Sequence, residues 1–142
     1  MNKRIETYLE TKRHYGIFIL RFFIGLRLIY GVIDNIVSWD QMIEFSSFLH
    51  SSGFPIPVAS AVISVYAQFI CALLLLVGYK IRYATIVLIF NFSIALILVH
   101  IKAGDSIEGM TPALAMLFGS ITLLFTGADK ISIDHLLKLK NQ

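Results

Sequence analysis

Four long apolar runs, separated by short polar segments, dominate the pattern of hydrophobic and polar positions along the chain. They cover about residues 17–37, 57–78, 83–101 and 111–127. Each is close to the roughly 20 residues that a helix needs to cross the hydrocarbon core of a bilayer. None has the period-two alternation of a membrane-spanning strand, and four strands could not close a barrel. The sequence therefore predicts an all-α integral membrane protein, a four-helix bundle that forms a single domain over residues 1–142.

The segment between the first two runs, residues 38–53, carries a helical pattern of its own. Its apolar side chains recur at helical spacing: Trp39, Met42, Ile43, Phe45, Phe48 and Leu49. Ser38 and Gln41 have the spacing of a capping box, in which a serine caps the first turn of a helix. The pattern predicts a short amphipathic helix that lies in the membrane interface or folds over the bundle as a lid. A merely apolar connector is the alternative.

The fourth run starts and stops at residues that commonly bound helices. Thr111 precedes Pro112, a pair that fits an N-cap followed by proline at the first helical position. Gly127 at the other end is typical of a helix C-terminus. These signals predict a fourth helix over about residues 111–127.

Basic residues are distributed unequally between the two sides of the predicted spans. Nine lie on the side of the two termini: Lys3, Arg4, Lys12, Arg13, Lys80, Arg82, Lys130, Lys138 and Lys140. Lys102 is alone on the other side. Because short cytoplasmic segments of membrane proteins carry an excess of Lys and Arg, both termini are predicted to be cytoplasmic. This topology explains the net charge of +3 without a nucleic-acid partner.

The first span contains three ionisable side chains, Arg21, Arg27 and Asp34. A charge at the centre of a membrane helix costs about 2.5–3.5 kcal/mol on insertion scales, so such residues usually face protein, water or each other. Arg27 and Asp34 are seven residues apart, which places them on one helix face about 10 Å apart along the axis. They are predicted either to form a buried ion pair or to line a site. Arg21 is closer to the end of the span, where its long stem is expected to reach the headgroups.

Polar side chains also recur at matching depths in the first three spans. Arg27 and Gln68 are at the midpoints of the first two spans, and Asn91 is next to that of the third. Further toward the outer face, the same spans carry Tyr30, Asp34, Tyr66 and His100. If these side chains face inward, they form a polar column from the middle of the membrane to its outer surface. The alternative is that the amides only join neighbouring helices by hydrogen bonds.

Several kinds of site lack the residues that they need. No HxxxH or ExxH pair offers ligands for a metal, and His14 and His100 are predicted at opposite ends of the bundle, which disfavours a bis-histidine haem. No phosphate-binding motif of a nucleotide site is present. Cys71 is the single cysteine, so a disulfide within the chain is impossible. No cofactor is demonstrable from these residues alone.

The order and spacing of several residues resemble the DoxX family of small four-span bacterial membrane proteins, over roughly residues 21–134. The residues that match the family pattern are Arg21, Gly25, Gly31, Gly78, Arg82, His100, Gly127, Ser132 and Asp134, with a Gly-x-Pro turn at residues 53–55. The chain departs from the pattern at two intramembrane charges. Asp34 stands where the family usually has a lysine, and Gln68 where it usually has a glutamate.

The resemblance implies a four-helix bundle in the bacterial cytoplasmic membrane and an association with redox chemistry, since relatives include a subunit of an archaeal thiosulfate:quinone oxidoreductase. On a first hypothesis, the protein is a redox-associated subunit that interacts with a quinone. The candidate hydrogen-bond donors to the quinone are Arg27, Tyr66, Gln68, Asn91 and His100. His100 or Asp34 would exchange protons with the outer side, because quinone reduction takes up protons.

On a second hypothesis, the protein is a non-catalytic membrane protein that assembles with another protein or with a second copy of itself and stabilises it. A small transporter or a lipid-binding protein is a third, although four spans without repeats or broken helices argue against transport. The sequence leaves open whether the protein is an enzyme. The expected surroundings are the lipid bilayer, with a quinone, a redox protein or a homo-oligomer as candidate partners.

Overall fold

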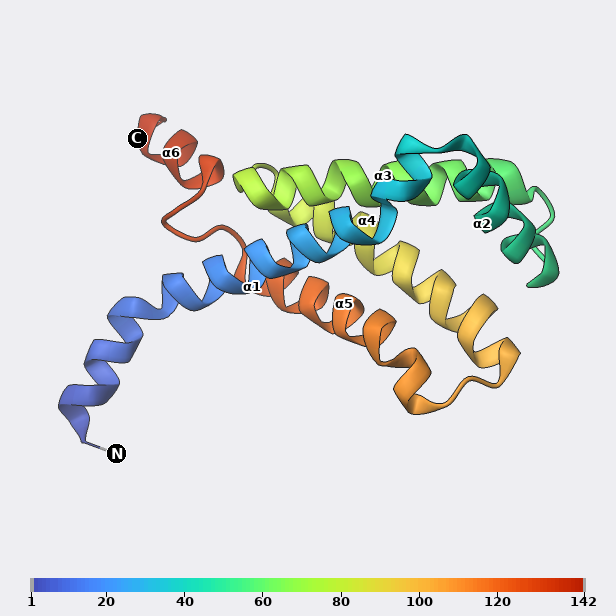
Figure 1. The fold of residues 1–142 in the computed structure, drawn as a ribbon. Coiled ribbons are helices and arrows are strands. Elements are labelled where there is room, and N and C mark those ends of the chain that lie inside the picture. Colours follow the sequence, from blue (N-terminus) through green and yellow to red (C-terminus); the bar gives the residue numbers. More distant parts are fainter. Residues whose placement is uncertain (1, 142) are drawn as a thin grey trace.

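A computed structural model describes residues 2–141, and within that range every regular element is a helix. Four helical segments are long and apolar enough to cross a membrane: α1 (Lys3–Val37), α3 (Pro57–Val77), α4 continued by η1 (Ile81–Ile94 and Ala95–Ile101), and α5 (Ile107–Thr126). Two shorter helices complete the fold, α2 (Trp39–Ser51) and α6 (Ile133–Lys140). The predicted all-α membrane bundle is therefore confirmed (Figure 1).

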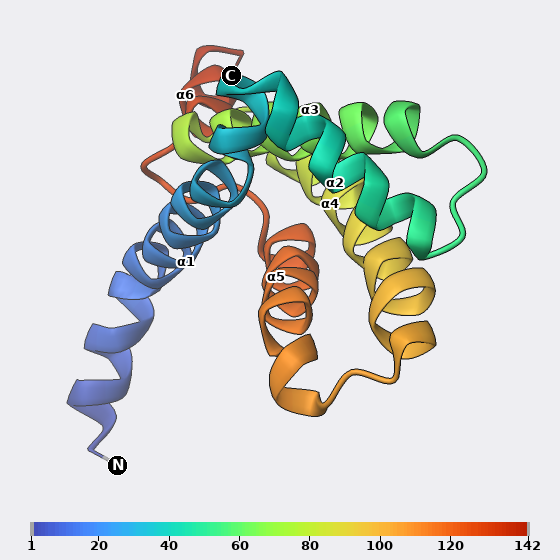
Figure 2. The ribbon, with the colours of Figure 1, turned by 45° about the vertical axis from the view of Figure 1, so that its right-hand side comes forward.

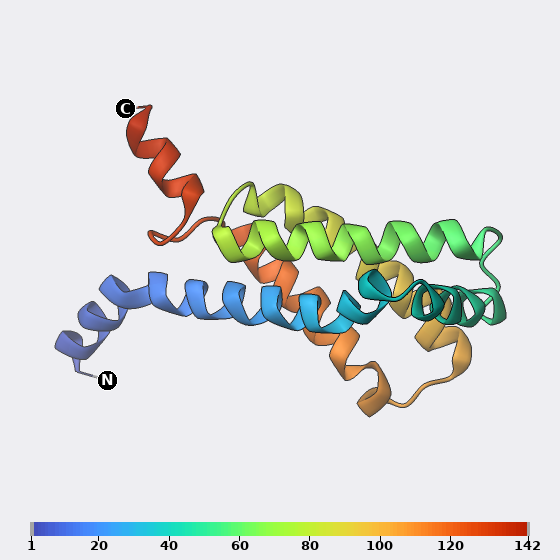
Figure 3. The ribbon, with the colours of Figure 1, turned by 45° about the horizontal axis from the view of Figure 1, so that its top comes forward.

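The four spans pack in the order α1, α3, α4 and α5, and α5 returns to α1 through a smaller contact. Both termini, the α3–α4 turn and α6 lie at one end, which we call the terminal end (Figures 1 and 3). The α2–α3 connection and the loop between η1 and α5 lie at the other, which we call the α2 end. Figure 2 shows α5 and η1 diverging toward that loop.

Two clusters of buried apolar side chains form the core. The first joins all four spans and includes Ile24, Leu28, Leu75, Leu88 and Leu123. The second joins α1, α2, α3 and η1 and includes Val32, Met42, Leu49, Val65 and Val99. Because α2 contributes Met42 and Leu49 to this second cluster, it is a packed part of the bundle and not a loose connector. Most large side chains outside the two clusters are apolar and exposed, as expected for surfaces that face lipid.

Two expected helix starts differ from the structure. Helix α5 begins at Ile107, because the Ser106 side chain caps it by accepting a hydrogen bond from the Gly109 backbone N–H (3.3 Å). The predicted N-cap, Thr111, is one turn inside the helix and donates its hydroxyl to the Ile107 carbonyl (2.7 Å), and Pro112 is inside the helix as well. At α2, Ser38 occupies the N-cap position without a side-chain capping bond, so the predicted capping box does not form.

We expect Ser106→Ala to lower the free energy of unfolding by about 1 kcal/mol, the usual cost of losing an N-cap. The matched control is Thr111→Ala, which removes a hydroxyl that only bonds back to its own helix and should change the stability little. Thermal unfolding in mild detergent measures both variants. A larger loss in the Thr111 variant would contradict the observed helix start.

The third span changes its winding near the α2 end. Residues Ala95–Ile101 form a π-helix, η1, which continues α4 directly and contains His100. π-Helical turns are rare and frequently occur at functional sites. The π-helix therefore makes the side chains around His100 candidates for a functional site.

Candidate functional site

Arg21 lies at the terminal end and is almost completely buried, with an exposed fraction of 1%. Its Nε pairs with Asp129 Oδ2 at 3.1 Å. The remaining guanidinium nitrogens donate to the backbone carbonyls of Leu75, Leu76 (3.1 Å) and Ile131 (2.8 Å). The prediction that Arg21 extends to the headgroups is wrong, because a buried carboxylate neutralises its charge and carbonyls accept its other donors. Sequence reasoning missed Asp129, although an acidic residue just beyond the fourth span was a signal that could have found it.

A second set of bonds attaches the C-terminal segment to the α3–α4 turn. The Asp134 carboxylate accepts hydrogen bonds from the backbone N–H groups of Lys80 (2.9 Å) and Ile81 (3.1 Å). The Asp134 N–H donates to the carbonyl of Gly78 at 2.9 Å. Arg21, Gly78, Asp129 and Asp134 together form what we call the terminal clasp. It satisfies its own charges and serves to hold helices together.

Two further residues of the family pattern permit close packing. A Cβ on Gly25 would lie 3.2 Å from the backbone carbonyl oxygen of Ala72, so the glycine lets α1 approach α3. Gly127 has a φ of +69° and would place a Cβ 3.2 Å from Nε of Arg82. These residues therefore maintain the geometry of the bundle.

Polar side chains from several spans meet between the middle of the bundle and its α2 end, in a pocket of about 240 Å³ that we call the central pocket. Its lining comes from all four spans: Arg27, Leu28, Gly31, Gln68, Phe92, Ala95, His100, Pro112, Ala113 and Met116. Three of the residues predicted to form the polar column, Arg27, Gln68 and His100, are thus brought together here.

A second and larger pocket, of about 400 Å³, lies between α2, α3, α4 and η1, and we call it the lateral pocket. Most of its wall is apolar, with four phenylalanines: Phe45, Phe48, Phe54 and Phe90. Its polar lining residues are Ser60, Ser64, Asn91 and His100. Phe90 and Ile63, which line the pocket, are largely exposed on the surface of the spans, so this pocket adjoins the side of the bundle that faces lipid.

A chain of hydrogen bonds connects the two pockets. Ser64 donates its hydroxyl to Asn91 Oδ1 (2.8 Å), and Gln68 donates its amide to Ser64 Oγ (3.2 Å). Ser64 and Asn91 line the lateral pocket, Gln68 lines the central pocket, and His100 lines both. Gln68 and Asn91 are therefore linked only through Ser64, which sequence reasoning did not single out.

His100 is held from the loop that follows η1. Its Nδ1 lies 2.7 Å from Asp105 Oδ2. A carboxylate on one ring nitrogen orients an imidazole and leaves the other nitrogen available to a ligand. The ring can therefore present Nε2 as a donor or acceptor in a fixed direction.

The other predicted site residues lie outside both pockets. Asp34 and Tyr66 are exposed and line neither the central nor the lateral pocket. The expected ion pair between Arg27 and Asp34 is not among the salt bridges within residues 2–141. Instead, the Arg27 guanidinium lies over the ring of Tyr30, 5.7 Å from its centroid. This aromatic ring is one turn away on the same helix, whereas Asp34 is two turns away.

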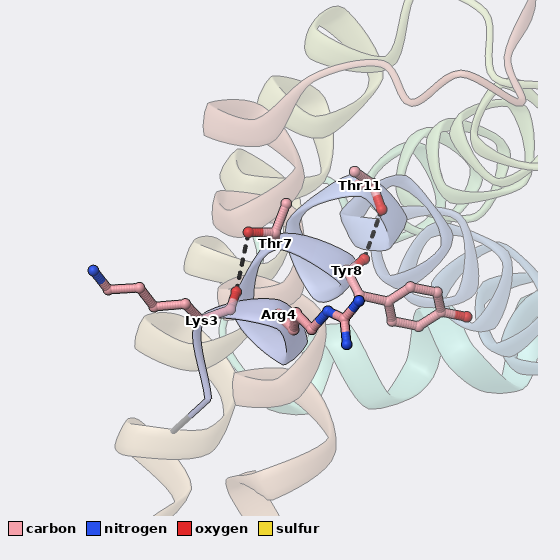
Figure 4. A pocket seen from close by; sticks show the side chains of 5 residues that line it. All are labelled: Lys3, Arg4, Thr7, Tyr8 and Thr11. Carbon is pink, nitrogen blue, oxygen red and sulfur yellow. Dashed lines mark hydrogen bonds between the residues drawn. The ribbon is translucent and has the colours of Figure 1, made fainter.

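An additional hollow on the first turns of α1 does not have the character of a site. It is lined by Lys3, Arg4, Thr7, Tyr8 and Thr11, all from one helix (Figure 4). The hydroxyls of Thr7 and Thr11 donate to carbonyls of the same helix. All five lining residues belong to α1, so within residues 2–141 no second element contributes to the lining of this hollow.

Comparison with known families matches residues 16–101 to the profile described as DoxX. This match covers more than half of the chain, from the middle of α1 to the end of η1. Neither the curated proteins nor the solved structures yield a match. The matched range includes every residue of the central pocket except those contributed by α5, and the whole lateral pocket.

Proposed function

The chain belongs to the DoxX family of membrane proteins, and from this premise we propose that it binds a membrane quinone in the lateral pocket as a redox-associated subunit. The proposed setting is the bacterial cytoplasmic membrane, with the terminal end facing the cytoplasm. The excess of Lys and Arg at that end supports this orientation.

The observation that carries the proposal is the chemistry of the lateral pocket. A lipid-soluble quinone needs an apolar wall for its ring and tail and a few donors for its two carbonyl oxygens. Phenylalanines supply the wall, and the volume of about 400 Å³ is within the usual range of small-molecule pockets. The Asn91 Oδ1 already accepts a bond from Ser64, so its NH₂ group is the part left to donate to a carbonyl. His100 supplies a second polar group at the α2 end of the same pocket.

The central pocket gives the lateral pocket a polar neighbour. Arg27 places a positive charge there, which would favour negative charge on a nearby oxygen atom. A bound quinone would supply two-electron chemistry coupled to proton uptake. The side chains of Ser64, Gln68 and His100 connect the two pockets, and hydroxyl, amide and imidazole groups can each both donate and accept hydrogen bonds. The His100–Asp105 pair lies at the α2 end, where it would exchange protons with the outer side.

The test is the small-molecule content of the protein purified in mild detergent, followed by titration with ubiquinone-2 and menaquinone-2. We expect a quinone at close to one per chain. Asn91→Leu and His100→Leu should each lower the affinity about tenfold, because each removes a hydrogen bond with a net value of about 1–1.5 kcal/mol. Mass spectrometry of the extract and equilibrium binding measure the two quantities.

The matched control is Tyr66→Phe, which removes a polar group from the same span region but lines neither pocket. Its quinone content and affinity should equal those of the unchanged protein. Purified protein that contains only phospholipid and binds neither probe would contradict the proposal. That result would favour the non-catalytic assembly role, in which the Gln68–Ser64–Asn91 chain only joins α3 to α4.

A further inference from the structure

A third pocket lies at the terminal end, on the opposite end of the bundle from the proposed quinone site. It has a volume of about 420 Å³. The start of α4, the end of α5 and helix α6 form it, through Lys80, Arg82, Tyr83, Thr126, Ala128, Asp134, Leu137, Lys138 and Asn141. We call it the basic pocket, because three of these side chains are cations and one is an anion.

In the described part of the chain, the three cations of the basic pocket are not paired with a carboxylate, whereas the one carboxylate of the pocket already accepts hydrogen bonds from the backbone. Within residues 2–141, none of Lys80, Arg82 and Lys138 takes part in a salt bridge. Asp134 accepts hydrogen bonds from the backbone N–H groups of Lys80 and Ile81. These bonds occupy the N–H groups of the residue before α4 and of its first residue. The cationic side chains are therefore the main groups left to bind an anion in the pocket.

The pocket is placed at the depth of lipid headgroups. Helix α4 begins at Ile81 and α5 ends at Thr126, so the pocket lies where two membrane spans reach the surface of the bilayer. Arg82 is held at this level because Gly127 has no side chain, which leaves room for the guanidinium against the end of α5. The positive charge therefore lies beside the carbonyl end of a helix, where cations are favoured.

Helix α6 adds an apolar component next to these charges. It stands away from the four spans in Figure 3, and its leucines, Leu136, Leu137 and Leu139, are exposed. Lys138 and Lys140 lie in its last turn. A short helix with leucines and lysines at the end of a membrane span is suited to lie in the headgroup region of an anionic leaflet.

We infer that the basic pocket binds the phosphate-bearing headgroup of an anionic phospholipid. Arg82, Lys80 and Lys138 surround the phosphate, and Leu137 with the ring of Tyr83 contacts the glycerol and the start of the acyl chains. Basic pockets at the ends of membrane helices are a known way of selecting anionic lipids. The site is independent of the quinone proposal, since it shares no residue with the lateral or the central pocket.

The experiment compares three probes on the purified protein: dioleoyl-phosphatidylglycerol, dioleoyl-phosphatidylcholine and inorganic phosphate. Native mass spectrometry counts the lipid that stays bound, and titration gives its affinity. We expect phosphatidylglycerol to be retained and to raise the thermal unfolding temperature, and the other two probes to do neither. In Arg82→Gln/Lys138→Gln its affinity should fall roughly 30-fold, at about fivefold for each cation removed.

The matched control is Lys3→Gln/Arg4→Gln, which removes the same charge from the terminal end but from residues outside the basic pocket. It should keep the affinity for phosphatidylglycerol within about twofold. Lys138→Gln alone, on the exposed helix α6, serves if the double variant does not fold, and should lose about fivefold. Equal losses in the pocket and control variants would overturn the inference in favour of general surface attraction. Equal binding of phosphatidylcholine, or equal stabilisation by inorganic phosphate, would overturn it as well.

Discussion

Replacing Arg21 with alanine should lower the free energy of unfolding by about 3–5 kcal/mol, because it leaves a buried carboxylate without its counter-ion. Asp129, the partner at 3.1 Å, has an exposed fraction of 3%. The substitution also leaves the carbonyls of Leu76 and Ile131 without the donors that they have in the clasp. Chemical or thermal unfolding in mild detergent measures the change.

The matched control for Arg21 is the other arginine of the same span. Arg27 is exposed and forms no salt bridge within the described residues, so Arg27→Ala should not lower the free energy of unfolding by more than about 1 kcal/mol. A double variant tests whether the loss of stability comes from the unpaired buried carboxylate. Removing both charges in Arg21→Met/Asp129→Leu should recover much of the loss, since apolar groups of similar size often replace a buried ion pair without penalty. Equal effects of the two arginine substitutions would contradict the terminal clasp.

The second large effect is expected at Gly78. Gly78→Ala should cost about 2–5 kcal/mol, the sum of a left-handed backbone penalty and of overpacking. The glycine has a φ of +73°, and a Cβ there would lie 2.6 Å from Arg21 Nη1 and 2.8 Å from the Ser132 Cα. The second of these atoms belongs to backbone that Ser132 and Asp134 hold in place, so it cannot move away cheaply.

Gly104 provides the control that separates strain from crowding. It has nearly the same φ, +72°, but nothing lies within 4 Å of the position of its Cβ. Gly104→Ala should therefore cost only the backbone penalty of about 1–2 kcal/mol. Unfolding curves of the two variants under the same conditions give the difference. If both substitutions lower the free energy of unfolding equally, the close approach of the C-terminal segment to Gly78 does not add to the cost of a side chain there.

Hydropathy predicted where the spans lie but not how the polar residues within them are used. The ends of the first three spans follow from the sequence within a few residues, apart from the start of α1, which extends to Lys3. Apolar length and flanking polar residues determine such ends, and both can be counted along the chain. The predicted start of α5 was wrong, because Ser106 caps the helix about one turn before Thr111.

The depth of a residue along its span can be estimated from the sequence, whereas the direction of its side chain around the helix cannot. Arg27, Gln68 and His100 share a pocket as their depths suggested, and Gln68 reaches Asn91 through Ser64. Hydropathy carries little information about which way each side chain points. It therefore could not separate Arg21, which is buried among other segments, from the exposed Arg27.

The Arg21–Asp129 contact also determines when during synthesis the charge of Arg21 can be paired. The two residues are 108 positions apart, and the carboxylate follows the last span. Throughout synthesis of the intervening helices, the arginine has no carboxylate partner, although the Leu75 and Leu76 carbonyls of α3 are made earlier than Asp129. Neutralisation of its charge is therefore expected to be a late step, and a chain that stops before residue 129 has no counter-ion for this arginine. The ion pair thus distinguishes a finished chain from an unfinished one.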